Sequence, residues 1–131
     1  MVMARHLRIE FPGAMYHVTV RGNRRALIFD DDVDHRTFLE KLEAAVQAFH
    51  VRVYLFCLLK NHVHLLAETP IANLSDFMSQ LLSSYCIYYN RRHRRRGHVT
   101  QARYGAKLVE GEEYLLGSSA ESVGQEVHLG A

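Results

Sequence analysis

The chain has 131 residues, of which 48% are hydrophobic and 23% charged, with a formal net charge of +2. This length fits one domain, and the composition is ordinary for a soluble globular protein. No apolar run reaches the roughly 18 residues that a membrane helix needs, and the N-terminus lacks the apolar stretch of a secretory signal. We therefore expect one domain over residues 1–131, a cytoplasmic location and no membrane partner.

The first predicted elements are a strand and a helix. Residues 14–21 alternate between apolar and polar side chains, which is the two-residue period of a strand buried on one face. Three aspartates at positions 30–32 can cap a helix N-terminus, and apolar residues then recur at helical spacing from Phe38 to Phe49. This pattern predicts an amphipathic helix.

A β-hairpin is predicted next. Residues 51–59 are apolar on both alternating faces, as in a strand in the middle of a sheet. Lys60 and Asn61 form a short turn, and residues 62–67 alternate again as a second strand. The two strands are therefore expected to pair with each other.

The pattern continues with a second helix from residue 73 to about 90, for which Asn73 or Ser75 can act as the cap. A short strand over 106–109 and a last helix around 112–126 complete the chain. The order strand, helix, strand, strand, helix, strand is the split βαβ or ferredoxin-like arrangement. We predict an α+β fold with an antiparallel sheet, two helices on one of its faces and a short C-terminal helix.

His62 and His64 are the sharpest chemical signal. Residues two apart on a strand project from the same face, so two imidazoles can meet one metal ion. Taken alone, such a pair is more readily explained as an accidental pair on the surface. Asn61 directly before it and an arginine-rich segment after it favour a metal site beside a polyanion.

Arginines gather at the end of the first strand and at the end of the second helix. Cations are favoured at a helix C-terminus whether or not anything binds there. Aromatic residues are interleaved with these arginines, however, and single-stranded nucleic acid binding uses both kinds of side chain. Tyr85 and Tyr88 fit a core position better than a base-stacking role. The predicted DNA-binding residues are Arg21, Arg24, Arg25, Arg91, Arg92, Arg94, Arg95, Arg96 and Arg103.

Five motifs occur in a fixed order along the chain. They are Phe11-Pro12-Gly13-Ala14-Met15-Tyr16-His17-Val18, Arg21-Gly22-Asn23, Asn61-His62-Val63-His64-Leu65-Leu66, Asn90-Arg91-Arg92-His93 and Gly97-His98-Val99-Thr100-Gln101-Ala102-Arg103-Tyr104. Together they resemble the REP-associated, single-tyrosine HUH transposases of bacterial insertion sequences, over about residues 4–116. The resemblance implies a ferredoxin-like fold, binding of hairpin-forming single-stranded DNA, and a Mg²⁺ or Mn²⁺ ion held by His62, His64 and a third polar ligand.

In that family a tyrosine on the last helix attacks the DNA phosphate and forms a phosphotyrosine link. This sequence departs from the family pattern after about residue 116. An ungapped comparison places Glu121 at the tyrosine position and Gln125 at the third metal ligand, and a shifted register places Glu126 at the tyrosine position. Glutamate cannot form the phosphotyrosine. Tyr114 is the nearest surviving tyrosine and the remaining candidate nucleophile, although we expect it near the start of the helix.

Two functions follow from these residues. One is a transposase-like protein that binds hairpin DNA and has lost cleavage, with Gln125 completing the metal site. The alternative is a non-catalytic, nucleic-acid-binding ferredoxin-like module that is indifferent to metal. Whether the chain is an enzyme stays open, and an exposed sheet face or edge strand would permit a homodimer. A small metal-dependent hydrolase without a DNA partner would need more acidic ligands near the histidines.

Overall fold

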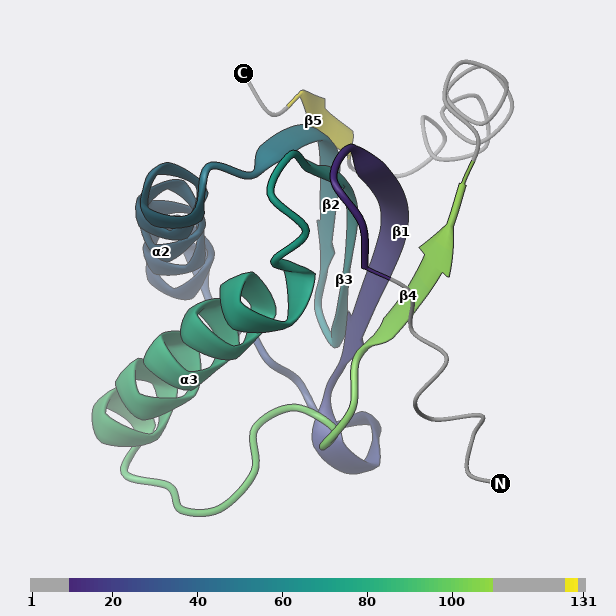
Figure 1. Ribbon diagram of the computed structural model, residues 1–131. Coiled ribbons are helices and arrows are strands. Elements are labelled where there is room, and N and C mark those ends of the chain that lie inside the picture. The colour runs from purple at the N-terminus through teal and green to yellow at the C-terminus, as the bar shows by residue number, and fades with distance from the viewer. Residues whose placement is uncertain (1–9, 110–126, 130–131) are drawn as a thin grey trace.

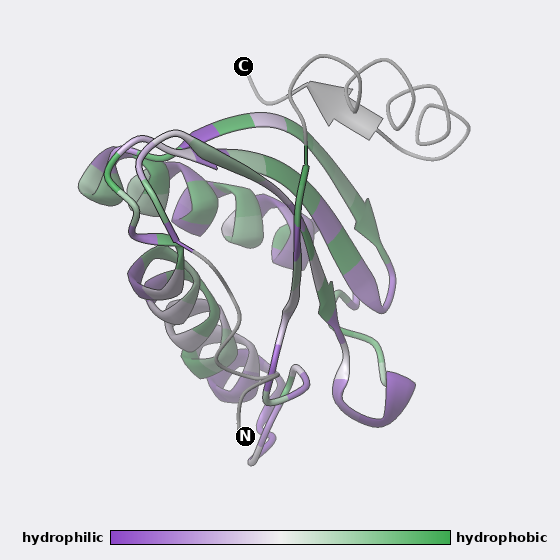
Figure 2. Cartoon of the chain, turned by 45° about the vertical axis from the view of Figure 1, so that its right-hand side comes forward, coloured by the Kyte–Doolittle hydropathy of each residue, from purple (hydrophilic) through white to green (hydrophobic). Residues whose placement is uncertain are grey.

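The fold is a five-stranded antiparallel sheet with two long helices on one face. The computed structural model describes residues 10–109 and the backbone of 127–129. The elements are β1 (Ala14–Arg21), η1 (Asn23–Arg25), α2 (Asp32–Phe49), β2 (Arg52–Leu59), β3 (His62–Thr69), α3 (Leu74–His93), β4 (Gly105–Leu108) and β5 (Val127–Leu129) (Figure 1). The strand order is β4-β1-β3-β2-β5, and α2 and α3 lie together on one side of the sheet (Figures 1 and 2). The predicted α+β class and ferredoxin-like order are confirmed.

The register of β1 against β3 sets the two faces of the sheet. Thr19 lies opposite His64, and Arg21 lies opposite His62. Tyr16, Val18 and Val20 on β1 are buried under the helices. The alternate residues of β1 therefore lie on the face that carries no helix, as the two-residue period predicts.

The hairpin of β2 and β3 turns at Lys60 and Asn61, as expected. β2 lies inside the sheet because β5 pairs with its residues 55–57. β5 was not predicted from the sequence, since three residues are too few to display an alternating pattern. The predicted C-terminal helix over 112–126 lies outside the described residues.

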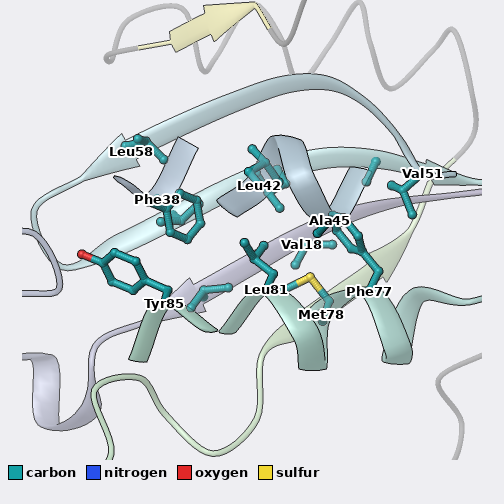
Figure 3. Close-up of a cluster of buried hydrophobic side chains, with 14 of the residues drawn as sticks. Val18, Phe38, Leu42, Ala45, Val51, Leu58, Phe77, Met78, Leu81 and Tyr85 are labelled. Atoms are coloured by element: carbon teal, nitrogen blue, oxygen red, sulfur yellow. The ribbon is translucent and has the colours of Figure 1, made fainter. Parts of the chain in front are cut away.

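One hydrophobic core joins the sheet to both helices. Figure 3 shows Phe38 and Leu42 of α2 facing Met78 and Leu81 of α3, with Val18 of β1 beside them. All five side chains are at most 5% exposed. This apolar contact carries most of the favourable free energy of folding. No helix in the described part of the chain is long and apolar enough to cross a membrane.

The two helices are capped differently. α2 begins after Asp31, whose carboxylate accepts a hydrogen bond from the backbone N–H of Asp34 at 3.1 Å, as expected for an N-cap. Asn73 occupies the N-cap position of α3, but its side chain donates to the backbone oxygen of Phe49 instead. Ser75 donates its N–H and its hydroxyl to the Glu10 carboxylate, 65 residues earlier in the chain. A cap from so distant a residue cannot be read from local sequence.

A buried carboxylate joins the start of α2 to the end of α3. Asp34 is fully buried and accepts hydrogen bonds from Arg92 at 2.8 Å and from the Tyr88 hydroxyl at 2.6 Å. Its second oxygen lies 2.9 Å from His93 Nε2 and accepts the backbone N–H of Asp30. Burial alone would raise the pKa of Asp34, but these hydrogen bonds outweigh it and lower the pKa.

Asp34→Ala should lower the free energy of unfolding by about 3 kcal/mol, because it leaves Arg92 and the half-buried Tyr88 hydroxyl without their shared acceptor. Urea denaturation at neutral pH measures this difference. Asp32→Ala is the matched control, since Asp32 is exposed in the same helical turn. We expect this control to cost under about 1 kcal/mol. Equal losses in the two variants would contradict a special role for Asp34.

Candidate metal centre and nucleic-acid interface

Three histidines meet on the face of the sheet that carries no helix. His62 and His64 alternate on β3, and His17 comes from the neighbouring strand β1. The ring centroids of His62 and His64 are 4.9 Å apart, and those of His17 and His64 are 5.1 Å apart. The structure thus brings the predicted pair together and adds His17, whose distance in sequence concealed it.

The hydrogen bonds of the pair use the Nδ1 atom of each ring. His62 Nδ1 lies 2.9 Å from Asn61 Oδ1, and His64 Nδ1 lies 2.9 Å from His17 Nε2. Within residues 10–109, neither Nε2 atom of the pair has a hydrogen bond. A histidine that carries its proton on Nδ1 has a lone pair on Nε2, which is the arrangement found in metal-ligating histidines. Two such imidazole donors match the ligand chemistry of a divalent metal ion.

The surroundings keep these imidazoles neutral. Burial, the neighbouring histidines and Arg21 lower the pKa of His64 to about 4. Burial and Arg21 lower the pKa of His62, and burial and Lys107 lower that of His17. Neutral imidazole is the form that binds a metal, so no proton has to leave at neutral pH.

Two of the predicted site residues cannot be placed. Tyr114, the candidate nucleophile, and Gln125, the candidate third ligand, lie outside the described residues. Their roles therefore remain predictions. Glu121 and Glu126 also lie outside the described residues. The backbone of residues 127–129, which follow them in sequence, forms β5.

A second group of possible ligands lies between the helices, and it was not predicted. The side chains of Asp30, Asp34 and His93 place ligand atoms within 4.8 Å of one another. The Arg92 guanidinium and the Tyr89 hydroxyl already occupy this group, at 2.8 Å from Asp34 and 2.6 Å from Asp30. A cation in contact with the carboxylate opposes a second one. We therefore interpret this cluster as the contact that joins the two helices.

The arginines predicted to bind DNA fall into different environments. Arg92 makes ion pairs with Asp31 and Asp34, so its guanidinium has a structural role that the sequence pattern concealed. The other arginines at the end of α3, residues 91 and 94–96, are exposed. Arg24 and Arg25 lie in η1 with left-handed φ angles of 56° and 63°. Asn61 Nδ2 donates to the backbone oxygen of Arg25 at 3.4 Å, so η1 lies directly beside the histidine pair.

Beside the histidines lies a cationic groove of 510 Å³ between β1 and β4. Its lining is His17, Thr19, Arg21, His64, Gln101, Arg103, Tyr104, Gly105, Ala106 and Lys107. Arg21 and Arg103 were predicted to bind DNA. Lys107, Gln101 and Tyr104 were not assigned. Lys107 pairs across the strands with His17 and shares its face, and only the observed register of β1 against β4 reveals this.

A second groove of 540 Å³ runs between α3 and the segment 97–104. Its lining contains no Asp, Glu, Lys or Arg and includes Ser79, Ser83 and Met78. Gln101 and Tyr104 line both grooves. The two grooves therefore meet at these residues and differ in charge.

Comparisons with known proteins agree with this fold. A family model described as "Transposase IS200 like" matches residues 10–116. A REP-associated tyrosine transposase solved bound to a REP hairpin is 12% identical with a TM-score of 0.72, covering 93% of this chain and 74% of that chain. A candidate transposase from Deinococcus radiodurans R1 is 15% identical with a TM-score of 0.61, covering 95% and 98%. At these identities the structures show the fold alone. No curated protein matches the chain significantly.

The low pKa of His64 should make the metal-free protein less stable in weak acid. The unfolded chain takes up a proton at the ordinary histidine pKa of 6.5, whereas folded His64 does so only at about 4. The free energy of unfolding should therefore fall as the pH falls from about 6.5 to 4, and His64→Gln should reduce that decline. Urea denaturation across this range with a chelator measures it. His50→Asn is the control, because His50 is an exposed histidine at the C-terminal end of α2. An unchanged decline in His64→Gln would contradict the expectation.

Proposed function

Because the chain belongs to the IS200-like transposase family, we propose that it binds hairpin-forming single-stranded DNA on the open sheet face, beside a divalent ion held by His62 and His64. The observation that carries this proposal is the cationic groove that shares His64 with the histidine pair. A related fold was solved with a REP hairpin bound, which supports this class of ligand.

The charges of the first groove suit a DNA backbone. Arg21, Arg103 and Lys107 present three cations around the groove, and phosphate contacts supply much of the affinity for nucleic acid. Arginine can also grip a phosphate with two parallel hydrogen bonds. We propose that these three residues bind phosphates next to the histidines.

The second groove suits the bases of a single strand. Unpaired bases need neutral surfaces with hydroxyl and amide groups and some apolar contact. The serines of α3, the partly exposed Leu82 and the Gln101 amide supply such a surface. Because Gln101 and Tyr104 line both grooves, a strand with phosphates in the first groove can reach the second with its bases. Double-stranded DNA offers no such exposed base faces.

The ion is proposed to be Mg²⁺ or Mn²⁺, with Gln125 as its third protein ligand. When bound, it would polarise a phosphate oxygen and offset developing negative charge. His62 and His64 would hold it through Nε2, while Asn61 and His17 contact the opposite ring nitrogens. Zn²⁺, Ni²⁺ and Co²⁺ bind imidazole more tightly than Mg²⁺ does, so a purified sample can contain a different ion.

We propose that this chain binds DNA without cutting it. In the family reaction a tyrosine oxygen bonds to phosphorus, the P–O3′ bond breaks, and the released 3′ oxygen takes a proton. Glu121 or Glu126 stands where that tyrosine is expected, and neither can form a phosphotyrosine. Tyr114 is the tyrosine nearest in sequence to those positions, and we propose that it does not serve as the nucleophile.

Removing two phosphate contacts should weaken DNA binding in a salt-dependent way. Arg21→Ala with Arg103→Ala should raise the Kd for a hairpin-bearing single strand at least about tenfold, and should flatten the dependence of log Kd on log salt by about 1.4. Fluorescence anisotropy with Mn²⁺ measures both quantities. Arg52→Ala is the matched control, because Arg52 is 67% exposed and lines neither groove.

The same assay separates the proposal from a metal-independent binding module. We expect a chelator and His62→Ala to weaken hairpin binding by similar factors. Binding that is indifferent to both would favour the module. Equal effects of Arg52→Ala and of the double variant would contradict the assignment of the groove.

The missing tyrosine predicts that no covalent adduct forms. The protein is incubated with a labelled hairpin-bearing single-stranded DNA library and Mn²⁺, and the products are separated by denaturing electrophoresis. We expect binding but neither nicks nor slow-migrating adducts. A metal-dependent adduct that disappears in Tyr114→Phe would show that Tyr114 is the nucleophile and would overturn the proposal. Tyr54→Phe is the control, since the Tyr54 hydroxyl donates a hydrogen bond to Glu68 and Tyr54 lines neither groove.

A further inference from the structure

We propose that His17 is a positioning residue for the metal centre: it accepts a hydrogen bond from the Nδ1–H of His64 and so keeps the Nε2 lone pair of His64 available to the ion. This inference rests on the proposed function, because it assigns a role toward the ion held by His62 and His64. It adds a residue from a different strand, 47 positions earlier in the chain.

The contact between the two rings is direct. His17 Nε2 lies 2.9 Å from His64 Nδ1, and the ring planes are inclined by 35°. The backbone register of β1 and β3 holds this contact, because Thr19 lies opposite His64 and His17 is two residues away on the same face. Thr19 Oγ1 is 3.4 Å from the same Nδ1 atom. Both rings are half-buried, so little water competes for the bond.

The direction of the hydrogen bond decides what His64 can do. A neutral imidazole has one N–H and one lone pair. If His17 donated to His64 Nδ1, the proton of His64 would be on Nε2, and that atom could not bind an ion. If His17 accepts, the Nε2 lone pair of His64 remains available. The proposed metal centre therefore requires His17 to be the acceptor.

His62 makes the same kind of hydrogen bond through Nδ1. Here the contacts of Asn61 identify the acceptor atom. Asn61 directs Nδ2 to the backbone oxygen of Arg25, which can only accept. Asn61 Oδ1 is then the atom that faces His62 Nδ1, so this ring must donate from Nδ1. Both rings thus make their hydrogen bond through Nδ1, and by analogy His17 is the acceptor for His64 as Asn61 is for His62.

His17 does not fit the alternative role of a third ligand. Its Nε2 atom is already engaged by His64. Among residues 10–109, the group of three ligand atoms that lie within 4.8 Å of one another is Asp30, Asp34 and His93, and the three sheet histidines do not form such a group.

The test compares two substitutions in the full chain. His17→Gln keeps an amide oxygen that can accept from His64, whereas His17→Leu keeps the size and removes the acceptor. Calorimetric titration with Mn²⁺ alone measures affinity, with His62→Ala as the loss of a ligand and His50→Asn as the neutral control. Imidazole ¹⁵N spectra of the metal-free protein locate the proton of His64, and thermal denaturation verifies that each variant is folded.

We expect the His64 proton on Nδ1 in the unsubstituted protein. His17→Leu should weaken Mn²⁺ binding about 10- to 100-fold, the range seen when an outer partner of a metal-bound histidine is removed. His17→Gln should recover most of that loss. A His64 proton on Nε2, or unchanged affinity in folded His17→Leu, would overturn the role of His17. A loss in His17→Gln as large as in His62→Ala would instead make His17 a ligand.

These readouts separate the two proposals. If the unsubstituted protein binds no Mn²⁺, with or without hairpin DNA, the proposed metal function fails. The ¹⁵N spectra of the metal-free protein do not depend on that result, so they test the hydrogen bond from His64 to His17 by themselves.

Discussion

Thr19 lies opposite His64 and Arg21 lies opposite His62 because β1 and β3 pair in one register. Side chains alternate along both strands, so a slip of one residue would turn Val63 and Leu65 out of the core and the histidines into it. Val63 and Leu65 are at most 1% exposed, and the helices cover only their face. Packing of apolar residues thus fixes the positions of polar ones. The candidate metal centre depends on this register more than on any polar contact of its own.

The packing of the helices likewise decides which arginines of the run 91–96 form ion pairs and which stay exposed. α3 ends against the start of α2, so Arg92 reaches Asp31 and Asp34 while the residues beyond it remain exposed. Tyr88 and Tyr89 donate to Asp34 and Asp30 in the same contact. Aromatic and basic residues that look like a nucleic-acid surface in sequence therefore also serve to join two helices. The surface that remains for the proposed DNA is the sheet face and its flanking loops.

The electrostatics of that face suit a polyanion better than a bare metal ion. Arg21, Arg103 and Lys107 surround neutral imidazoles, and the groove lining includes no carboxylate. Positive neighbours oppose the binding of a divalent cation, whereas a DNA phosphate placed between them attracts it. The proposed ion and the proposed DNA would therefore assist each other, which is a coupling between two ligands of one site.

The sequence by itself predicted the order of the elements, the one-sided sheet, and the pairing of His62 with His64 on one face. These features depend on periods of two and 3.6 residues, which are local properties of the chain. Only the tertiary structure brought His17 and Lys107 to that site, gave Arg92 to Asp34, and placed Glu10 at the start of α3. It also added β5 at the edge of β2. Each of these contacts joins residues distant in sequence, and such pairs are selected by the packing of whole strands and helices rather than by any local pattern.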